Sequence, residues 1–219
     1  MCEGLADTDL RWEDGVPVSI RFDDPYYARS DGLAESRHVF LDGNGLAERF
    51  AVADRFHIAE LGFGTGLNFM AAWALWRKVA PAGAVLSHTS FERYPMPKDA
   101  QIRALSIWPE LNNLAEAMIQ RDMPDVQLSV IEGDVRNTLP AWDGIADAWF
   151  LDGFAPARNP EMWEPPLMQA VHDRTGADGS FATYTAAGHV RRSLESAGFS
   201  VFKRPGFGTK REMLTGRRR

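Results

Sequence analysis

The sequence predicts an α/β protein with a mostly parallel sheet, preceded by a small extension that contains short strands. Two observations support this fold class. From residue 56 onward, apolar runs of strand length alternate with segments of helical spacing. A glycine-rich turn follows the first of these strands. Because strands that alternate with helices form parallel sheets covered on both faces, we expect one main domain over residues 55–219 and an extension over residues 1–54.

The extension shows little helical periodicity and is rich in Asp, Gly and aromatic residues. These features favour short strands. We also expect a hairpin at Asp42-Gly43, because Asp-Gly is a favourable two-residue turn between strands.

The first half of the main domain reads as two strands and their helices. Phe56–Leu61 is a short apolar run that ends at the glycine-rich turn, and Leu67–Val79 combines helical spacing with good helix formers. Val85–Phe91 is the second strand. Asp99–Gln120 is expected to be helical, possibly as two helices, since Trp108 precedes a proline and therefore resists the α region.

The second half continues the alternation. Val126–Ile131 alternates like a strand, and Ala146–Leu151 is a buried apolar strand. The remaining elements are expected at Glu161–Arg174 (helix, interrupted by two prolines), Ser180–Thr185 (strand), Gly188–Ala197 (helix, stopped by Gly198), and Phe199–Lys203 with Glu212–Thr215 (strands). The last two strands are expected to pair antiparallel around a Pro-Gly-rich turn.

Composition places the chain among ordinary globular proteins. Its 219 residues can bury a proper core, and 45% of them are hydrophobic. No apolar run approaches the roughly 18 residues needed to cross a bilayer, so no membrane association is expected. The start of the chain lacks the pattern of a signal peptide. The single cysteine, Cys2, cannot form an internal disulfide, which favours a cytoplasmic location, and the histidines have no ligand spacing, so no metal is expected.

The charge is unevenly distributed. The net charge is −6, but residues 185–219 hold nine Lys/Arg and two Glu, whereas residues 1–184 hold 15 Lys/Arg and 28 Asp/Glu. The sums are +7 and −13. This asymmetry fits a surface that faces phosphates. A solvated, charge-rich surface explains it equally well, so charge alone does not decide.

The glycine-rich turn points to a particular cofactor. Glu60 ends the first strand, and Gly62, Gly64 and Gly66 follow at every second position. Nicotinamide folds use G-x-G-x-x-G, which would place the third glycine at residue 67. The spacing seen here is instead typical of class I methyltransferases, a Rossmann-like fold whose turn wraps the methionine part of S-adenosylmethionine. We group Asn68, at the start of the next helix, with these cofactor contacts.

Three further acids end the next strands, on the side where parallel sheets bind ligands. Glu92 is expected to hold the ribose hydroxyls, because a carboxylate can accept both. Asp134 is expected to read the adenine amine, and Asp152 to face the transferring methyl group. Each acid singly is equally well explained as a strand-end or helix-capping residue. The set of four supports the class.

Several longer blocks resemble one methyltransferase family. They are residues 22–27, 60–69, 108–110, 149–163 and 203–214, which include Leu-Asp-Gly-Phe-Ala-Pro and Gly-Phe-Gly-Thr-Lys-Arg-Glu-Met. The chain is similar over residues 10–216 to the methyltransferase domain of the bifunctional tRNA 5-methylaminomethyl-2-thiouridine biosynthesis proteins (MnmC). The resemblance implies methylation of the exocyclic amine of an aminomethyluridine at the tRNA wobble position.

Two departures qualify the resemblance. Ile131-Glu132 stands where the family more often has an aromatic residue, which weakens the expected packing around adenine. The FAD-dependent oxidase domain of the bifunctional proteins has no counterpart in these residues. An oxidase, as a further domain or a separate protein, is therefore expected to supply the aminomethyl substrate.

Roles follow for the remaining candidates. We expect Asp152 to orient the acceptor amine, since an ordinary Asp pKa of about 3.9 makes a poor base for it. Aromatic side chains that could stack on a splayed-out base are Tyr26, Tyr27, Phe154 and Trp163. Basic side chains that could contact tRNA phosphates are Lys203, Arg204, Lys210 and Arg211, together with Arg191, Arg192 and residues 217–219. Core packing and solubility are the competing explanations for these two groups.

Three other functions remain open. A methyltransferase of the same cofactor could act on a small-molecule or protein amine. A non-catalytic RNA-binding domain could retain the fold, although intact Glu60, Glu92 and Asp134 argue against it. A nicotinamide enzyme is disfavoured by the glycine spacing.

Overall fold

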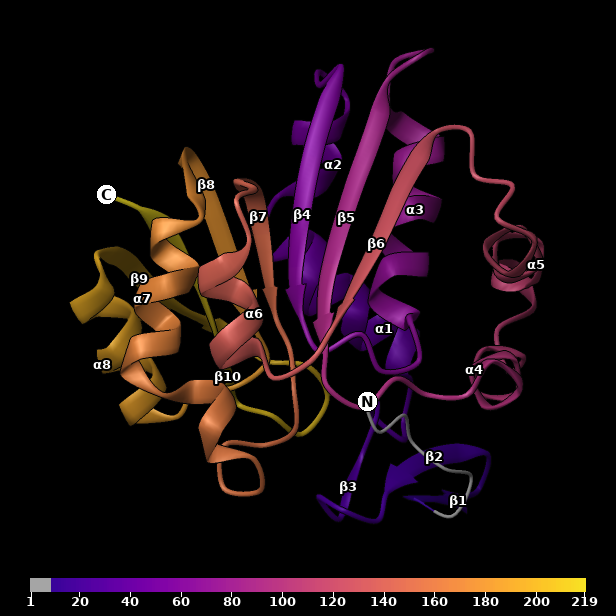
Figure 1. Cartoon of the computed structure of the whole chain (residues 1–219), viewed down its shortest axis with the longest axis horizontal. Helices are drawn as coiled ribbons and strands as arrows, with labels where there is room; N and C mark the ends of the chain where they lie inside the picture. Colours follow the sequence, from indigo (N-terminus) through magenta and orange to yellow (C-terminus); the bar gives the residue numbers. More distant parts are fainter. Residues whose placement is uncertain (1–8) are drawn as a thin grey trace.

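A seven-stranded sheet forms the centre of the computed structural model, which describes residues 9–219 apart from the side chain of Ile119 (Figure 1). Cys2 lies outside the described residues. The strands are β4 (Arg55–Leu61), β5 (Val85–Glu92), β6 (Val126–Glu132), β7 (Ala146–Leu151), β8 (Thr175–Thr183), β9 (Phe199–Pro205) and β10 (Glu212–Arg218), in the order β6-β5-β4-β7-β8-β10-β9. Strands β4 to β8 are parallel, and β10 runs antiparallel to β8 and β9. The predicted sheet, with its antiparallel C-terminal pair, is confirmed.

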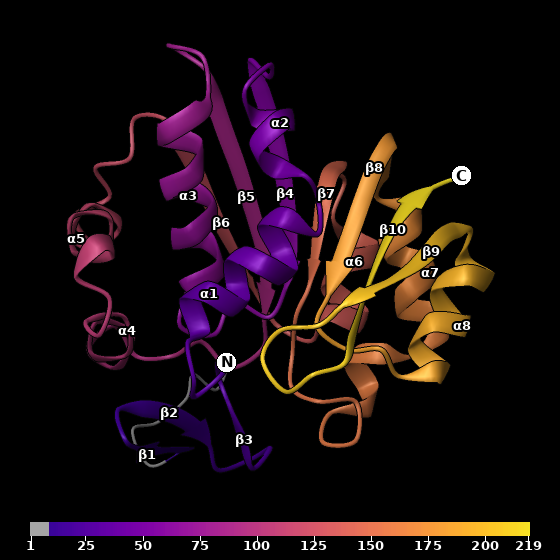
Figure 2. The ribbon, with the colours of Figure 1, turned by 180° about the vertical axis from the view of Figure 1, so that it is seen from behind.

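Helices cover both faces of this sheet. One face carries α1 (Gly32–Ser36), the π-helix η2 (Arg37–Asp42), α2 (Leu46–Phe50) and α3 (Leu67–Val79), as Figure 2 shows. The other carries α6 (Val135–Ala141), α7 (Pro165–Asp173) and α8 (Gly188–Ala197), with the 3-10 turn η4 (Pro160–Trp163) before α7. Beyond the β6 edge lie α4 (Lys98–Leu105), the 3-10 turn η3 (Pro109–Leu111) and α5 (Asn112–Gln120).

Side chains of the buried strands alternate between two hydrophobic cores. Phe150 packs with α3 and the N-terminal helices, while its neighbour Trp149 packs with α6, α7 and α8. Helix α3 buries Phe69, Trp73 and Trp76 completely or nearly so. It contains no proline or internal glycine and ends just before Pro81, where the preceding residue leaves the α region.

The strand order reverses between β4 and β7, because β5 and β6 add to one side and β8 to the other. Leu61 of β4 pairs with Leu151 of β7, so the residues that follow them, Gly62 and Asp152, lie side by side. Ligands of open α/β sheets bind at such a reversal, outside the carboxyl ends of the strands. A small antiparallel sheet of β1 (Leu10–Glu13), β2 (Val16–Ser19) and β3 (Asp24–Pro25) lies next to these ends (Figure 1).

The hairpin expected at Asp42-Gly43 is wrong. Residues 32–50 are helical, and Gly43 has an ordinary φ of −60°. Asp31 caps α1 by accepting a hydrogen bond from the Ala34 N–H. Buried Phe40 and Phe50 belong to the same core as α3, so burial against the sheet decides the structure here over the local Asp-Gly signal.

Other boundaries differ more modestly. The break at Trp108-Pro109 is confirmed, with α4 and α5 on either side. The prolines within the helix expected at Glu161–Arg174 occupy the start of α7, where a missing N–H costs nothing. Helix α6 was not expected, and β8 begins at Thr175, earlier than predicted.

Candidate functional site

The glycine-rich turn connects β4 to α3 at the carboxyl edge of the sheet. Gly62, Gly64 and Gly66 all have positive φ, of 83°, 52° and 80°. At Gly64 a side chain would also meet Tyr26, since an added Cβ would lie 3.1 Å from its ring. The N-terminal extension therefore packs directly on the turn, and only glycine fits the backbone at this contact.

Glu60, Asn68 and Asp152 form one hydrogen-bonded set beside this turn. The Asn68 amide nitrogen donates to Glu60 Oε1 at 3.0 Å and to Asp152 Oδ2 at 2.8 Å. Glu60 is fully buried and does not line the main cavity. Burial, followed by the charge of Glu60, raises the pKa of Asp152 to about 7. The structure thus brings together three residues that are 8 and 84 positions apart.

Glu92 holds the glycine-rich turn in place. Its Oε2 accepts hydrogen bonds from the backbone N–H groups of Phe63 and Gly64, both at 3.0 Å, and its Oε1 accepts one from Tyr94 at 2.7 Å. Burial raises the pKa of Glu92. A carboxylate has about four acceptor positions, so one remains. This narrows the expected bidentate hold on two ribose hydroxyls to a single additional hydrogen bond in this conformation.

Asp134 is the N-cap of α6 and the centre of an arginine cluster. It accepts from the Arg136 backbone N–H at 3.0 Å, from the Arg136 guanidinium at 3.0 and 2.6 Å, and from Arg93 at 2.9 Å. Hydrogen bonding to Arg136, with the nearby positive charges, lowers the pKa of Asp134. Its four acceptor positions are occupied, so a ligand amine would have to displace an arginine. The sequence did not single out Arg93 or Arg136.

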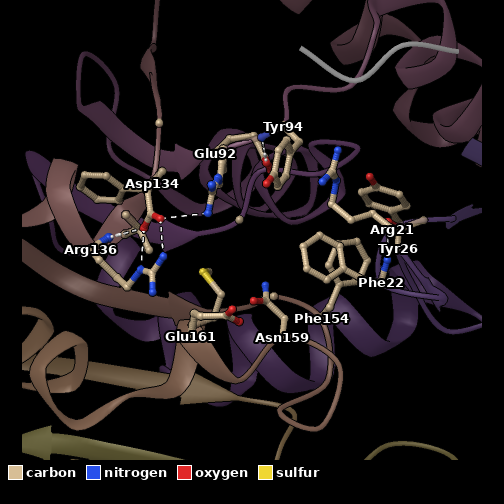
Figure 3. Close-up of a pocket in the computed structure, with 18 residues that line it drawn as sticks. Arg21, Phe22, Tyr26, Glu92, Tyr94, Asp134, Arg136, Phe154, Asn159 and Glu161 are labelled. Atoms are coloured by element: carbon tan, nitrogen blue, oxygen red, sulfur yellow. Dashed lines mark hydrogen bonds and ion pairs between the residues drawn. The ribbon is translucent and has the colours of Figure 1, made fainter. Parts of the chain in front are cut away.

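A cavity of about 270 Å³ opens between Glu92, Asp134 and the aromatic residues of the extension (Figure 3). Asp134 and Arg136 lie on one side of it, and Phe22, Tyr26 and Phe154 on the other. Its lining also includes Gly62, Gly133 and Gly153, glycines that follow three strands. A ribose-accepting carboxylate, a polar cluster, apolar rings and exposed backbone together fit a nucleoside-bearing ligand.

The aromatic side of the cavity joins segments that are far apart in the sequence. Phe154 stacks on Phe22 at a centroid distance of 4.6 Å and meets the edge of Tyr26 at 5.1 Å. The expectation that Tyr27 and Trp163 stack on a base is wrong. Tyr27 is 7% exposed and Trp163 1%, and their polar atoms bond to the Ala104 and Phe154 carbonyl oxygens. Both are core residues.

The expected phosphate-binding residues differ in their surroundings. Lys203 pairs with Glu212 at 2.7 Å, and Arg204 donates to the Asp42 carbonyl oxygen at 3.3 Å. Arg211 is exposed, and among the described residues its side chain has no hydrogen bond or ion pair.

Lys210 faces the site rather than solvent alone. It donates to Glu35 at 2.8 Å and lies 4.1 Å from the centre of the Tyr184 ring. Tyr184 in turn donates to the Gly153 carbonyl oxygen at 2.8 Å, one residue from Asp152. Sequence reasoning missed Glu35 and Tyr184. The only local signal was that Tyr184 directly follows the last residue of a buried strand.

Two searches of residues 9–219 complete the description. No group of three His, Cys, Asp or Glu side chains is placed to hold a metal ion. No helix has the length and apolar character to cross a membrane.

Comparisons with known proteins agree with this geometry. The sequence profile of a family described as S-adenosyl-L-methionine-dependent methyltransferase matches residues 98–219. The tRNA 5-methylaminomethyl-2-thiouridine biosynthesis bifunctional proteins MnmC of Caulobacter vibrioides and Pseudomonas aeruginosa are each 46% identical, over 95% and 94% of this chain. The chain spans only 38% and 34% of their lengths. The crystal structure of MnmC2 from Aquifex aeolicus has the same fold, with a TM-score of 0.79, 24% identity, and coverage of 92% of this chain and 66% of that one.

Proposed function

We propose that this chain, which belongs to the family of S-adenosyl-L-methionine-dependent methyltransferases, methylates the exocyclic amine of 5-aminomethyluridine, with or without a 2-thio group, at the wobble position of tRNA. Its relatives named as tRNA-modifying proteins support this substrate. The observation that carries the reaction is Asp152, a carboxylate of raised pKa placed between the glycine-rich turn and the aromatic side of the cavity.

The cavity supplies the groups that the cofactor needs. Backbone groups of the glycine-rich turn would hold its methionine part, the free acceptor position of Glu92 a ribose hydroxyl, and the Asp134 cluster the adenine. Bound S-adenosylmethionine supplies an electrophilic methyl group on a sulfonium sulfur.

Asp152 addresses the protonation of the acceptor. An alkyl amine with a pKa of about 10.4 is neutral at pH 7 only at a cost of about 4.6 kcal/mol. A carboxylate with a pKa of about 7 accepts a proton far more readily than one with a pKa of about 3.9. Asp152 therefore orients the amine through a hydrogen bond and takes up its proton. This role is stronger than the purely orienting one expected from an unperturbed aspartate.

The acceptor base would lie against the aromatic side. Phe154 and Tyr26 offer ring surfaces to a splayed-out uridine. Exposed Arg211, with Lys203 and Arg204, would contact the tRNA backbone, whereas Lys210 would act beside the site through Glu35 and Tyr184. An FAD-dependent oxidase, as a further domain or a separate protein, would supply the amine, and the reaction would take place in the cytoplasm.

Mass spectrometry of nucleosides tests the proposal directly. Hypomodified tRNA carrying aminomethyluridine is incubated with the protein and S-adenosylmethionine, and small amines serve as competing acceptors. We expect a gain of one methyl group on the wobble nucleoside, abolished in Asp152→Asn. Methylation of small amines alone would support the other methyltransferase reading, and no cofactor binding by calorimetry at hundreds of micromolar would support a non-catalytic domain.

Binding to tRNA gives a second measure. Replacing a side chain that contacts a phosphate lowers the slope of log affinity against log salt by about 1. Arg211→Ala is expected to do this with little change in kcat. Lys210→Ala is expected to lower kcat, because Lys210 is held against Glu35 and Tyr184. Equal effects of the two variants would remove the distinction.

A further inference from the structure

A chain of buried polar side chains leads from the centre of the sheet to Asp152. His88 on β5 and Glu60 on β4 are both 0% exposed, and His88 Nε2 lies 3.0 Å from Glu60 Oε2. Glu60 Oε1 accepts from Asn68 at 3.0 Å, and the same Asn68 nitrogen donates to Asp152 at 2.8 Å. The far end of this chain lies beneath the cavity, where His88 cannot contact a ligand.

The surroundings of His88 fix its protonation state. Its Nδ1 is buried and has no hydrogen-bond partner among the described residues. The rings of Phe69 and Phe150 lie edge-on to it, at 5.2 and 5.9 Å. A protonated imidazole would bury an unpaired, charged N–H at this position, which is costly. The neutral ring with its hydrogen on Nε2 leaves only an unfilled acceptor, so we assign this form, donating to Glu60.

The Asn68 amide is fixed in one orientation by its partners. Ser36 on α1 donates its hydroxyl hydrogen to Asn68 Oδ1 at 2.7 Å. The two amide hydrogens then go to the two carboxylates. Turning the amide over would aim its oxygen at both Glu60 and Asp152 and lose all three bonds.

We propose that His88 is a positioning residue for Asp152, acting through Glu60 and Asn68. The neutral His88 ring holds the Glu60 carboxylate, Glu60 and Ser36 hold the Asn68 amide, and Asn68 holds one oxygen of Asp152. The backbone N–H of Gly153 holds the other oxygen at 2.9 Å. The inference rests on the proposed function for the role of Asp152 in transfer, but the chain itself can be tested without substrate.

The groups that face Asp152 determine how its ionisation responds. Glu60 and Glu35 raise its pKa, and the neutral phenol of Tyr184 lies nearby. Lys210 neutralises part of the Glu35 charge through their ion pair. Removing the donor of His88 leaves the Glu60 carboxylate with one partner fewer, which makes Glu60 easier to protonate. Its repulsion of the Asp152 charge then weakens, so the pKa of Asp152 falls.

The experiment is a carbon-13 NMR titration of the Asp152 carboxyl group in the protein without ligands. His88→Leu removes the donor to Glu60, and His88→Gln keeps a neutral one. Ser90→Ala is the matched control, because Ser90 is also buried on β5 and its hydroxyl has no partner among the described residues. We expect a midpoint near pH 7 for the unsubstituted protein, a midpoint lower by about one unit in His88→Leu, and little change in His88→Gln and Ser90→Ala.

A folded His88→Leu variant with an unchanged midpoint would overturn the proposal, as would equal shifts in His88→Leu and His88→Gln. If His88→Leu does not fold, Glu60→Gln takes its place, and an unchanged midpoint there has the same meaning. Nitrogen-15 shifts of His88 should remain those of a neutral ring between pH 5 and 8, and a protonated ring in that range would also contradict the assignment.

Kinetics separate this inference from the proposed function. In His88→Leu we expect kcat to fall about ten-fold or more while the KM for tRNA stays constant, because His88 orients the base and does not touch the substrate. A protein that fails to methylate tRNA but shows the expected NMR shifts would refute the function and leave the positioning chain intact.

Discussion

The carboxylate of Asp24 on β3 accepts a hydrogen bond from the backbone N–H of Ala155 at 2.8 Å, across 131 positions of the chain. Beside this bond, Phe22 stacks on Phe154. The N-terminal sheet is thereby fastened to the loop that follows Asp152. Without these contacts the aromatic side of the cavity would have no fixed geometry.

Removal of this bond should loosen the site and the fold together. Asp24→Ala leaves the Ala155 N–H without its partner, and we expect the free energy of unfolding to fall by about 1–2 kcal/mol. Urea denaturation measures the change. Asp178→Ala is the control, since Asp178 is exposed on β8 and should change stability by less than about 0.5 kcal/mol. Equal losses in both variants would argue against a specific role for Asp24.

The raised pKa of Asp152 predicts an unusual dependence of stability on pH. Its folded-state pKa of about 7 lies above the ordinary value of 3.8, so the folded protein binds more protons than the unfolded chain between these values. Stability from this group is therefore full below about pH 4 and is lost as pH rises to about 7. Asp152→Asn removes the loss, although it unpairs the Gly153 N–H.

We expect Asp152→Asn to stabilise the protein at pH 8 by about 1–3 kcal/mol and to give a smaller gain or none at pH 4.5. Urea denaturation at the two pH values measures this. Asp134→Asn should behave in the opposite sense, because the pKa of Asp134 is lowered and its charge stabilises the fold at pH 8. Destabilisation by Asp152→Asn at pH 8 would contradict the raised pKa.

Asp134 has two separable roles, and two substitutions distinguish them. Serine is a good N-cap, so Asp134→Ser should keep most of the stability of α6, whereas Asp134→Ala should lose about 1 kcal/mol. Both remove the carboxylate that organises Arg93 and Arg136. We expect both to weaken S-adenosylmethionine binding in calorimetry by about ten-fold, the effect of a lost charged hydrogen bond. Unchanged affinity in both would make Asp134 a capping residue alone.

Residues 32–50 are predicted to be essential to the fold. Phe50 on α2 is 0% exposed and meets the edges of Phe56 and Trp76 at 5.0 and 4.9 Å. Phe50→Ala should lower the free energy of unfolding by about 3–5 kcal/mol. Phe202→Ala, at a side chain 58% exposed on β9, should cost less than about 1 kcal/mol. Similar costs would mean that α2 is a loosely attached extension.

Local pattern determined much of this molecule. Apolar runs and helical spacing extend over a few residues, so the sequence alone identified β4, α3, β7 and α8 almost to the residue. Parallel topology then placed Glu60, Glu92, Asp134 and Asp152 at one edge of the sheet, because parallel strands end on the same side. Hairpin chemistry at Asp42-Gly43 failed since the apolar residues around it are buried against α3 and the sheet.

Only the tertiary structure decided what each acid does. Asp134 lies among arginines, Glu92 holds the glycine-rich turn, and Glu60 meets His88 far from any ligand. Each of these partnerships depends on strand register and side-chain packing between segments 28 to 84 positions apart. The sequence specified carboxylates at strand ends, while burial and neighbouring donors determined which of them remains available and which has its pKa raised to about 7.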